Sequence, residues 1–103
     1  MRVRLLEEAE ADIDTAASFH ESRSPGLGAY FITCLAEDIG SLASYAGIHP
    51  RVYGKHRLLS KRFPYSIYYD IVGEGALVFG VFSDRMNPAG IRDSLETRDL
   101  NEG

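Results

Sequence analysis

The sequence is poor in cysteine and has no tryptophan: Cys34 is the only cysteine among 103 residues. A single cysteine cannot form an internal disulfide, which fits a reducing compartment better than an oxidising one. No histidine or second cysteine stands nearby to activate its thiol. We therefore expect Cys34 to be a small buried side chain and not a reactive group.

Long apolar runs are also missing. No run approaches the roughly 20 residues that a membrane-spanning helix needs. The first residues carry arginines, and Glu7, Glu8 and Glu10 follow directly, unlike the apolar stretch of a secretory signal. We expect a cytoplasmic protein that does not engage a membrane.

Motifs for cofactors and metal ions are absent as well. There is no glycine-rich phosphate loop and no zinc-ligand spacing. His49 and His56 are seven residues apart, with no carboxylate or thiol at a metal-binding offset. Asp12 and Asp14 are two residues apart on an expected helix, so they point to different faces and are unsuited to paired acid-base catalysis. The sequence predicts no metal site and no cofactor.

Length and composition indicate one folded domain. The chain is 45% hydrophobic and 25% charged, values that are ordinary for a soluble globular protein and too apolar for a disordered one. One hundred residues suffice for a single core between two layers of secondary structure. We expect residues 1–103 to form a single domain.

The first half predicts a short strand followed by two helices. Residues 3–6 form an apolar opening, and residues 7–21 show helical spacing with acidic side chains in the first turn. His20 lies on the apolar stripe and is expected to pack or cap. The segment 24–26, Ser-Pro-Gly, ends this helix and begins the next. Apolar spacing predicts a second helix of about 20 residues that stops near Gly47.

The second half predicts strands, because the apolar period changes to two after Arg51. Residues 52–60, 63–72 and 76–83 form three β-rich runs that short turns join into an antiparallel meander. We expect one face of the middle run to cover the helices. That face carries Phe63, Tyr65, Ile67, Tyr69 and Ile71. Residues 87–98 could add one or two helical turns, and residues 100–103 are expected to fray.

Positive charge is concentrated in one part of an acidic chain. The formal net charge is −4, yet residues 51–69 carry five bases and no acid. Strand alternation places Lys55, Arg57 and Lys61 on one face, and the meander returns Arg85 to Lys61 and Arg62. Such a surface suits phosphate oxygens, an anionic transition state or an acidic protein segment. The alternative is that these bases are ordinary solvated charges on an exposed sheet.

Three motifs and the order of elements together resemble a known family. A glycine precedes the second helix, which contains Tyr30-Phe31. Arg57 precedes the segment 62–69, RFPYSIYY. The segment 81–88, VFSDRMNP, is the end of a predicted strand followed by an arginine and then by Asn-Pro. Over nearly the whole chain these features resemble the ParE/RelE superfamily, the toxins of bacterial type II toxin-antitoxin pairs.

The resemblance implies an α+β fold of the RelE/ParE type. A two-helix hairpin would pack on a small, mainly antiparallel sheet in the order β-α-α-β-β-β, with room for a short C-terminal helix. It also implies a cognate antitoxin, whose C-terminal segment wraps the toxin and through which alone the pair would contact DNA.

Two toxic mechanisms occur in the superfamily. ParE-like members poison DNA gyrase without cutting a bond, whereas RelE-like members cleave messenger RNA on the ribosome. Cleavage needs a late tyrosine or other proton acceptor, and this chain has no tyrosine after Tyr69 and no histidine after His56. The acidic net charge also favours the ParE-like mechanism. Many ParE-like sequences carry a histidine where Ser83-Asp84 stands here.

The favoured interpretation is therefore a gyrase-inhibiting toxin that is not itself an enzyme. The alternatives are a ribosome-dependent endoribonuclease and a non-toxic relative that binds only the antitoxin. In the endoribonuclease, Arg57, Lys61 and Arg85 would hold the scissile phosphate. The expected target-binding residues are Lys55, Arg57, Lys61, Arg62 and Arg85. The expected antitoxin-binding residues are Phe82, Ile91 and Leu95, beside which an acidic amphipathic segment would lie.

Overall fold

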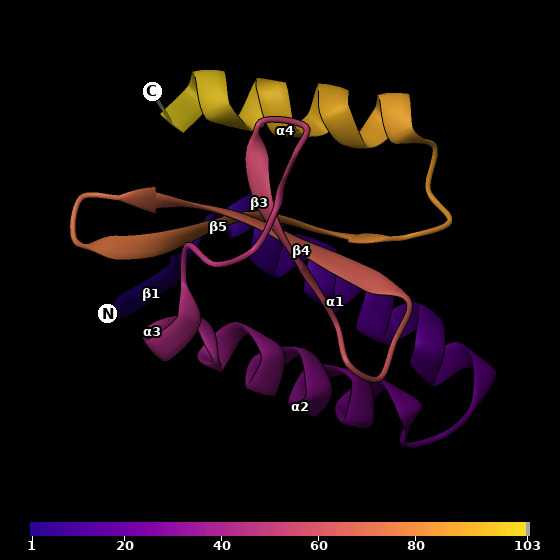
Figure 1. The fold of residues 1–103 in the computed structure, drawn as a ribbon. Helices are drawn as coiled ribbons and strands as arrows, with labels where there is room; N and C mark the ends of the chain where they lie inside the picture. Colours follow the sequence, from indigo (N-terminus) through magenta and orange to yellow (C-terminus); the bar gives the residue numbers. More distant parts are fainter. Residues whose placement is uncertain (103) are drawn as a thin grey trace.

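The computed structural model describes residues 1–102, and its element order confirms the α+β expectation. In chain order the elements are β1 (Arg2–Leu5), α1 (Glu7–Arg23), α2 (Leu27–Gly40), α3 (Leu42–Tyr45), β2 (Arg51–Val52), β3 (Lys55–Leu59), β4 (Tyr65–Val72), β5 (Gly75–Ser83) and α4 (Pro88–Glu102). Figure 1 shows α1 and α2 on one side of the sheet and α4 on the other.

The five strands lie in the order β1-β5-β4-β3-β2. β1 is parallel to β5, and the other pairs are antiparallel. β1 covers only the first part of β5, from Gly75 to Val78, after which the Leu6 N–H donates to the Val78 carbonyl and the chain enters α1. Within residues 1–102, no strand lies beside the rest of β5 on that edge.

The helical hairpin packs closely on the sheet. Glu21 joins its two helices, since its carboxylate accepts the N–H groups of Gly26 and Gly28, which lowers the pKa of Glu21. Beneath the hairpin lies the first core, which is formed by both helices and the inner face of the sheet. Its fully buried large side chains include Phe31, Leu35, Leu42, Ile67 and Tyr69.

Two smaller expectations about this core are confirmed. The Cys34 side chain is buried. The His20 ring packs 4.8 Å from the Phe31 ring, and its Nε2 lies 3.2 Å from the Tyr65 hydroxyl. Of the middle-run face that was expected to be core, Ile67 and Tyr69 are fully buried, whereas Ile71 near the hairpin tip is exposed.

The second helix is shorter than the apolar spacing predicts. α2 ends at Gly40, and the single turn α3 continues the apolar pattern in a separate segment. The reason is local: the Ser41 hydroxyl donates to the Asp38 carbonyl at 2.6 Å, and the Ser41 N–H bonds both Glu37 and Asp38 carbonyls. Such tightened bonding ends a regular helix.

The expected strand over residues 52–60 is divided by a tight turn. Arg51 pairs with His56 and Val52 with Lys55, so Tyr53 and Gly54 alone connect β2 to β3. Both have positive φ, 56° and 79°. Tyrosine seldom adopts this conformation, and therefore the sequence carries no clear turn signal there.

α4 is the main departure from the expected architecture. One or two turns were predicted, but the helix spans Pro88–Glu102, including residues 100–102 that were expected to fray. Gly103 lies outside the described residues. α4 covers the second face of the sheet and creates a second core, so β4 is buried on both faces. This core contains Tyr68, Leu77, Phe79, Phe82, Ile91 and Leu95.

No helix among residues 1–102 combines the length and apolar character that crossing a membrane requires.

Candidate functional site

Lys55 lies inside the molecule, although it was expected on an open basic surface. Its side chain is only 8% exposed, and its Nζ is 3.0 Å from Asp99 Oδ1 on α4. The ammonium also sits 4.2 Å from the centre of the Phe79 ring, with Asp70 at 3.8 Å. The charge of Lys55 is therefore neutralised within the chain.

Arg57 lies beside Tyr68, its partner across β3 and β4. Its Nε is buried and has no hydrogen-bond partner among the described residues. Burial raises the pKa of Tyr68, and the influence of Ser66 and Arg57 opposes that rise only partly. The phenol therefore stays protonated at neutral pH, where it can donate a hydrogen bond but cannot serve as a general base.

The loop with Lys61 and Arg62 does meet the end of β5, as the connectivity predicts: the Asp84 N–H donates to the Pro64 carbonyl at 2.8 Å. The side chains nevertheless diverge. Lys61 and Arg62 line a small pocket on α2, formed with Cys34, Glu37 and Asp38. The nearby Tyr30 hydroxyl is the largest influence that raises the pKa of Arg62. Arg85 follows β5 and is exposed.

The expected basic row is therefore not formed as one surface. β3 ends at Leu59, so Lys61 does not continue its alternation, and α4 covers Lys55. Among the five expected target-binding residues, Lys61, Arg62 and Arg85 are exposed, Arg57 is half-buried and Lys55 is buried.

The expected antitoxin-binding residues are also covered. Phe82, Ile91 and Leu95 are at most 7% exposed and pack together in the second core. Phe82 also lines the neighbouring groove between α1 and α4, whereas Ile91 and Leu95 face the sheet from α4. The accessible apolar surface lies next to them.

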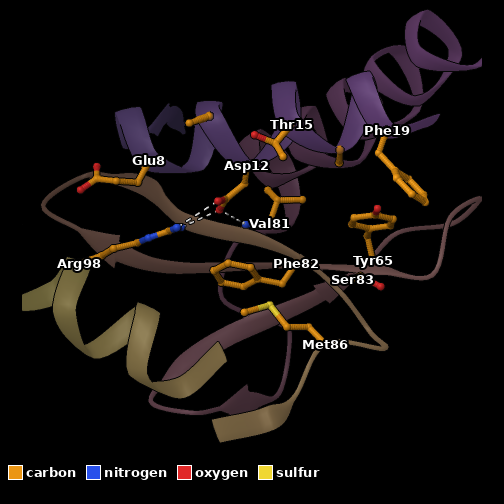
Figure 2. Close-up of a pocket in the computed structure, with 12 residues that line it drawn as sticks. Glu8, Asp12, Thr15, Phe19, Tyr65, Val81, Phe82, Ser83, Met86 and Arg98 are labelled. Atoms are coloured by element: carbon orange, nitrogen blue, oxygen red, sulfur yellow. Dashed lines mark hydrogen bonds and ion pairs between the residues drawn. The ribbon is translucent and has the colours of Figure 1, made fainter. Parts of the chain in front are cut away.

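That surface is a groove of about 570 Å³ along the end of β5. Figure 2 shows α1 above the groove, β5 at its base and α4 on the side opposite α1. Phe19 and Met86 are partly exposed at one end, 50% and 37%, and Glu8 and Arg98 lie at the other. An open groove with apolar lining suits a peptide better than a polar small molecule.

An ion pair bridges α1 and α4 across this groove. Arg98 Nη1 lies 2.6 Å from Asp12 Oδ2, and Arg98 Nη2 lies 3.0 Å from Asp12 Oδ1. Each partner also bonds the backbone of β5: Asp12 accepts the Val81 N–H at 3.0 Å, and Arg98 donates to the Phe79 carbonyl at 2.9 Å. The dashed lines in Figure 2 mark the bonds of Asp12 to Arg98 and Val81.

Sequence reasoning did not identify Asp12 or Arg98. A signal exists for Arg98, because it follows Leu95 by three residues and Ile91 by seven, a spacing that places all three on one face of α4. A base on an otherwise buried face requires an acidic partner. Nothing in the local sequence identifies that partner as Asp12, since it is 86 residues away.

Neither a family model nor a curated protein matches this chain. Its structure is similar to a solved chain of the chromosomal ParDE TA system from P. aeruginosa, with a TM-score of 0.73. The match covers 81% of this chain and 95% of that one at 19% identity. The chain therefore has a ParE-like fold, as its sequence motifs predicted.

Proposed function

We propose that this chain is the toxin of a type II toxin-antitoxin pair and that it inhibits DNA gyrase. The observation that carries the proposal is the likeness in fold to a chain of a ParDE system. The motifs around Arg57, Tyr65 and Arg85 independently resemble the same superfamily.

The arrangement of the bases supports a binding inhibitor over a nuclease. A nuclease needs positive groups converging on one phosphate and a base within reach of the attacking hydroxyl. Lys61 lies over α2, whereas Arg57 lies on the α4 side of the sheet. The tyrosine paired with Arg57 across β3 and β4 is Tyr68, whose raised pKa makes it a poor proton acceptor.

The same proposal requires an antitoxin. The groove between α1 and α4 offers the exposed apolar side chains Phe19 and Met86 next to polar backbone. Contact with DNA would come through the antitoxin, since the toxin chain is acidic, with a formal net charge of −4.

The test is to induce the chain in bacteria without an antitoxin and to pulse-label DNA and protein synthesis during the first minutes. We expect DNA synthesis to fail first and purified gyrase to be inhibited by the chain. If protein synthesis fails first and transcripts are cut, the ribonuclease alternative replaces this proposal. If neither changes, the chain is a non-toxic relative that binds only an antitoxin.

Charge reversal at exposed bases tests the target surface. We expect Arg85→Glu and Lys61→Glu to abolish growth arrest, because both side chains are exposed near the point where the loop between β3 and β4 meets the end of β5. Arg2→Glu is the matched control: Arg2 is an exposed base at the start of β1, at the far end of β5. Arrest by all three variants alike would place the target surface elsewhere.

A further inference from the structure

The loop between β3 and β4 carries two exposed bases, Lys61 and Arg62. Neither forms an ion pair among residues 1–102. Of the two acids that line a small pocket with these bases, Asp38 is buried, and only Glu37 is exposed. Exposed bases therefore outnumber exposed acids around this pocket, which favours an acidic partner.

The loop is held in place on both sides of its basic pair. Before the pair, the Ser60 hydroxyl donates to the buried Asp38 carboxylate at 2.6 Å. After it, the Phe63 ring packs against two rings of α2, at centroid distances of 4.9 and 5.8 Å. Figure 1 shows the loop reaching the first turns of α2. Lys61 and Arg62 thus lie on a pre-ordered loop, which loses little conformational entropy when a partner binds.

Tyr30 is the most exposed of the rings that surround Phe63. It is 47% exposed, although its ring contacts Phe63. Its hydroxyl also lies close enough to Arg62 to raise the pKa of that guanidinium. Tyrosine and arginine are among the residues that most often dominate the binding energy of protein interfaces. We call the surface formed by Tyr30, Lys61, Arg62 and Phe63 the loop patch.

The composition of the loop patch favours a protein partner over nucleic acid. Binding to a phosphate backbone relies on many basic contacts, whereas the patch offers two on a chain with a formal net charge of −4. An acidic protein segment needs fewer contacts, since two carboxylates could pair with Lys61 and Arg62 while an apolar side chain packs on Tyr30. None of the four residues lines the groove along β5.

We propose that the loop patch is the surface through which the chain holds its target protein. Tyr30 is the anchor, and Lys61 and Arg62 pair with an acidic segment of that protein. This inference rests on the proposed function, because it names where on the toxin the target would bind.

The probe for the anchor is purified DNA gyrase without DNA. Its affinity is measured by biolayer interferometry for the wild type, Tyr30→Ala and the matched control Tyr45→Ala, which removes a more exposed tyrosine from α3. We expect Tyr30→Ala to bind at least roughly tenfold more weakly than Tyr45→Ala. Tyr30→Phe keeps the ring on Phe63 and should restore most of the affinity. Thermal unfolding checks that every variant is folded.

The salt dependence of binding tests the charge of the partner segment. The affinity of the wild type should fall as the salt concentration rises from roughly 0.05 to 0.3 M. The double variant Lys61→Gln/Arg62→Gln should bind more weakly and show a flatter dependence. The matched control Arg2→Gln/Arg92→Gln removes two exposed bases elsewhere and should keep the slope of the wild type. Equal slopes for the two double variants would refute an acidic partner segment.

Three further outcomes would overturn the proposal. Equal affinities of Tyr30→Ala and Tyr45→Ala for gyrase, which the wild type still inhibits, would refute the loop patch and leave the proposed function standing. If Tyr30→Ala loses binding to a single-stranded oligonucleotide but keeps its affinity for gyrase, the occupant is nucleic acid. If the wild type neither binds nor inhibits gyrase, the proposed function fails, and this inference with it.

Discussion

A Cβ atom on Gly28 of α2 would lie 2.7 Å from the carbonyl oxygen of Ala17 in α1, closer than real Cβ contacts allow. The two helices therefore meet at a point where only glycine fits. Gly28 is buried at this contact, and Glu21 completes it by accepting the Gly28 N–H.

Gly28→Ala should destabilise the protein despite the better helix propensity of alanine. Separating the two backbones is expected to cost about 1–3 kcal/mol in the free energy of unfolding, measured by urea denaturation. Gly40→Ala is the matched control, since no atom lies within 4 Å of its added Cβ. That variant should be neutral or gain up to about 1 kcal/mol. Equal effects of the two would contradict the close helix contact.

The ion pair between Asp12 and Arg98 should contribute to stability as a coupled unit. Both side chains are about 15% exposed, so Asp12→Ala leaves a largely buried guanidinium and an unbonded Val81 N–H. We expect a loss of about 2–4 kcal/mol. A double-mutant cycle with Arg98→Ala should give a coupling of about 1–3 kcal/mol. Asp14→Ala, on the exposed face of α1, should change stability by less than about 0.5 kcal/mol.

Lys55→Met should leave growth arrest unchanged. The Lys55 ammonium faces Asp99 and Phe79 inside the chain, so a methionine side chain can fill its space. In the variant, Asp99 becomes solvated, and Asp70 retains its ion pair with Arg51 at 3.4 Å. We expect the free energy of unfolding to change by less than about 1.5 kcal/mol. The lowest inducer level that stops growth is the readout. A large rise in that level without loss of stability would show that Lys55 contacts the target.

His49 should make the protein less stable in mild acid. Burial, aided by repulsion from His56, lowers the pKa of His49 below its ordinary value of 6.5. The Tyr69 hydroxyl accepts the Gly47 N–H at 2.8 Å, so its own proton is left to donate to an unprotonated His49 Nδ1. The unfolded chain takes up the proton near pH 6.5 and the folded chain only at lower pH. Stability is therefore full above pH 6.5 and falls as the pH decreases toward the lowered pKa.

The measurement for this histidine is urea unfolding of the wild type and His49→Gln between pH 8 and pH 5. The stability advantage of the wild type should shrink on acidification. Parallel curves for the two proteins would show that another group causes any loss in acid.

The elements that could be predicted from the sequence are those whose apolar periodicity indicates the face that they bury. The apolar spacing of α1, β4 and β5 describes faces that they bury themselves, and these elements exist close to the predicted bounds. α4 was underestimated because only Ile91 and Leu95 mark its buried face, too few to define a helix of 15 residues.

The errors at the site follow from that one helix. The alternation of β3 correctly places Lys55 and Arg57 on one face, but whether that face is open depends on α4, which lies far along the chain. The same limit applies to Asp12, whose partner Arg98 is 86 residues away. The local sequence pattern predicts on which face of a strand or helix a residue lies. Only the tertiary structure determines which residues contact its side chain.

The parallel pairing of β1 with β5 has a consequence for synthesis of the protein. The strand of residues 2–5 leaves the ribosome well before its neighbour, residues 75–78. Until those residues emerge, the opening strand and the helical hairpin have no complete sheet to pack on, and contacts of such long range form late in folding. A prematurely ended product that stops before Gly75 should therefore be unfolded and open to proteolysis. For a chain proposed to stop growth, harm would then begin only after residues 75–78 have been made.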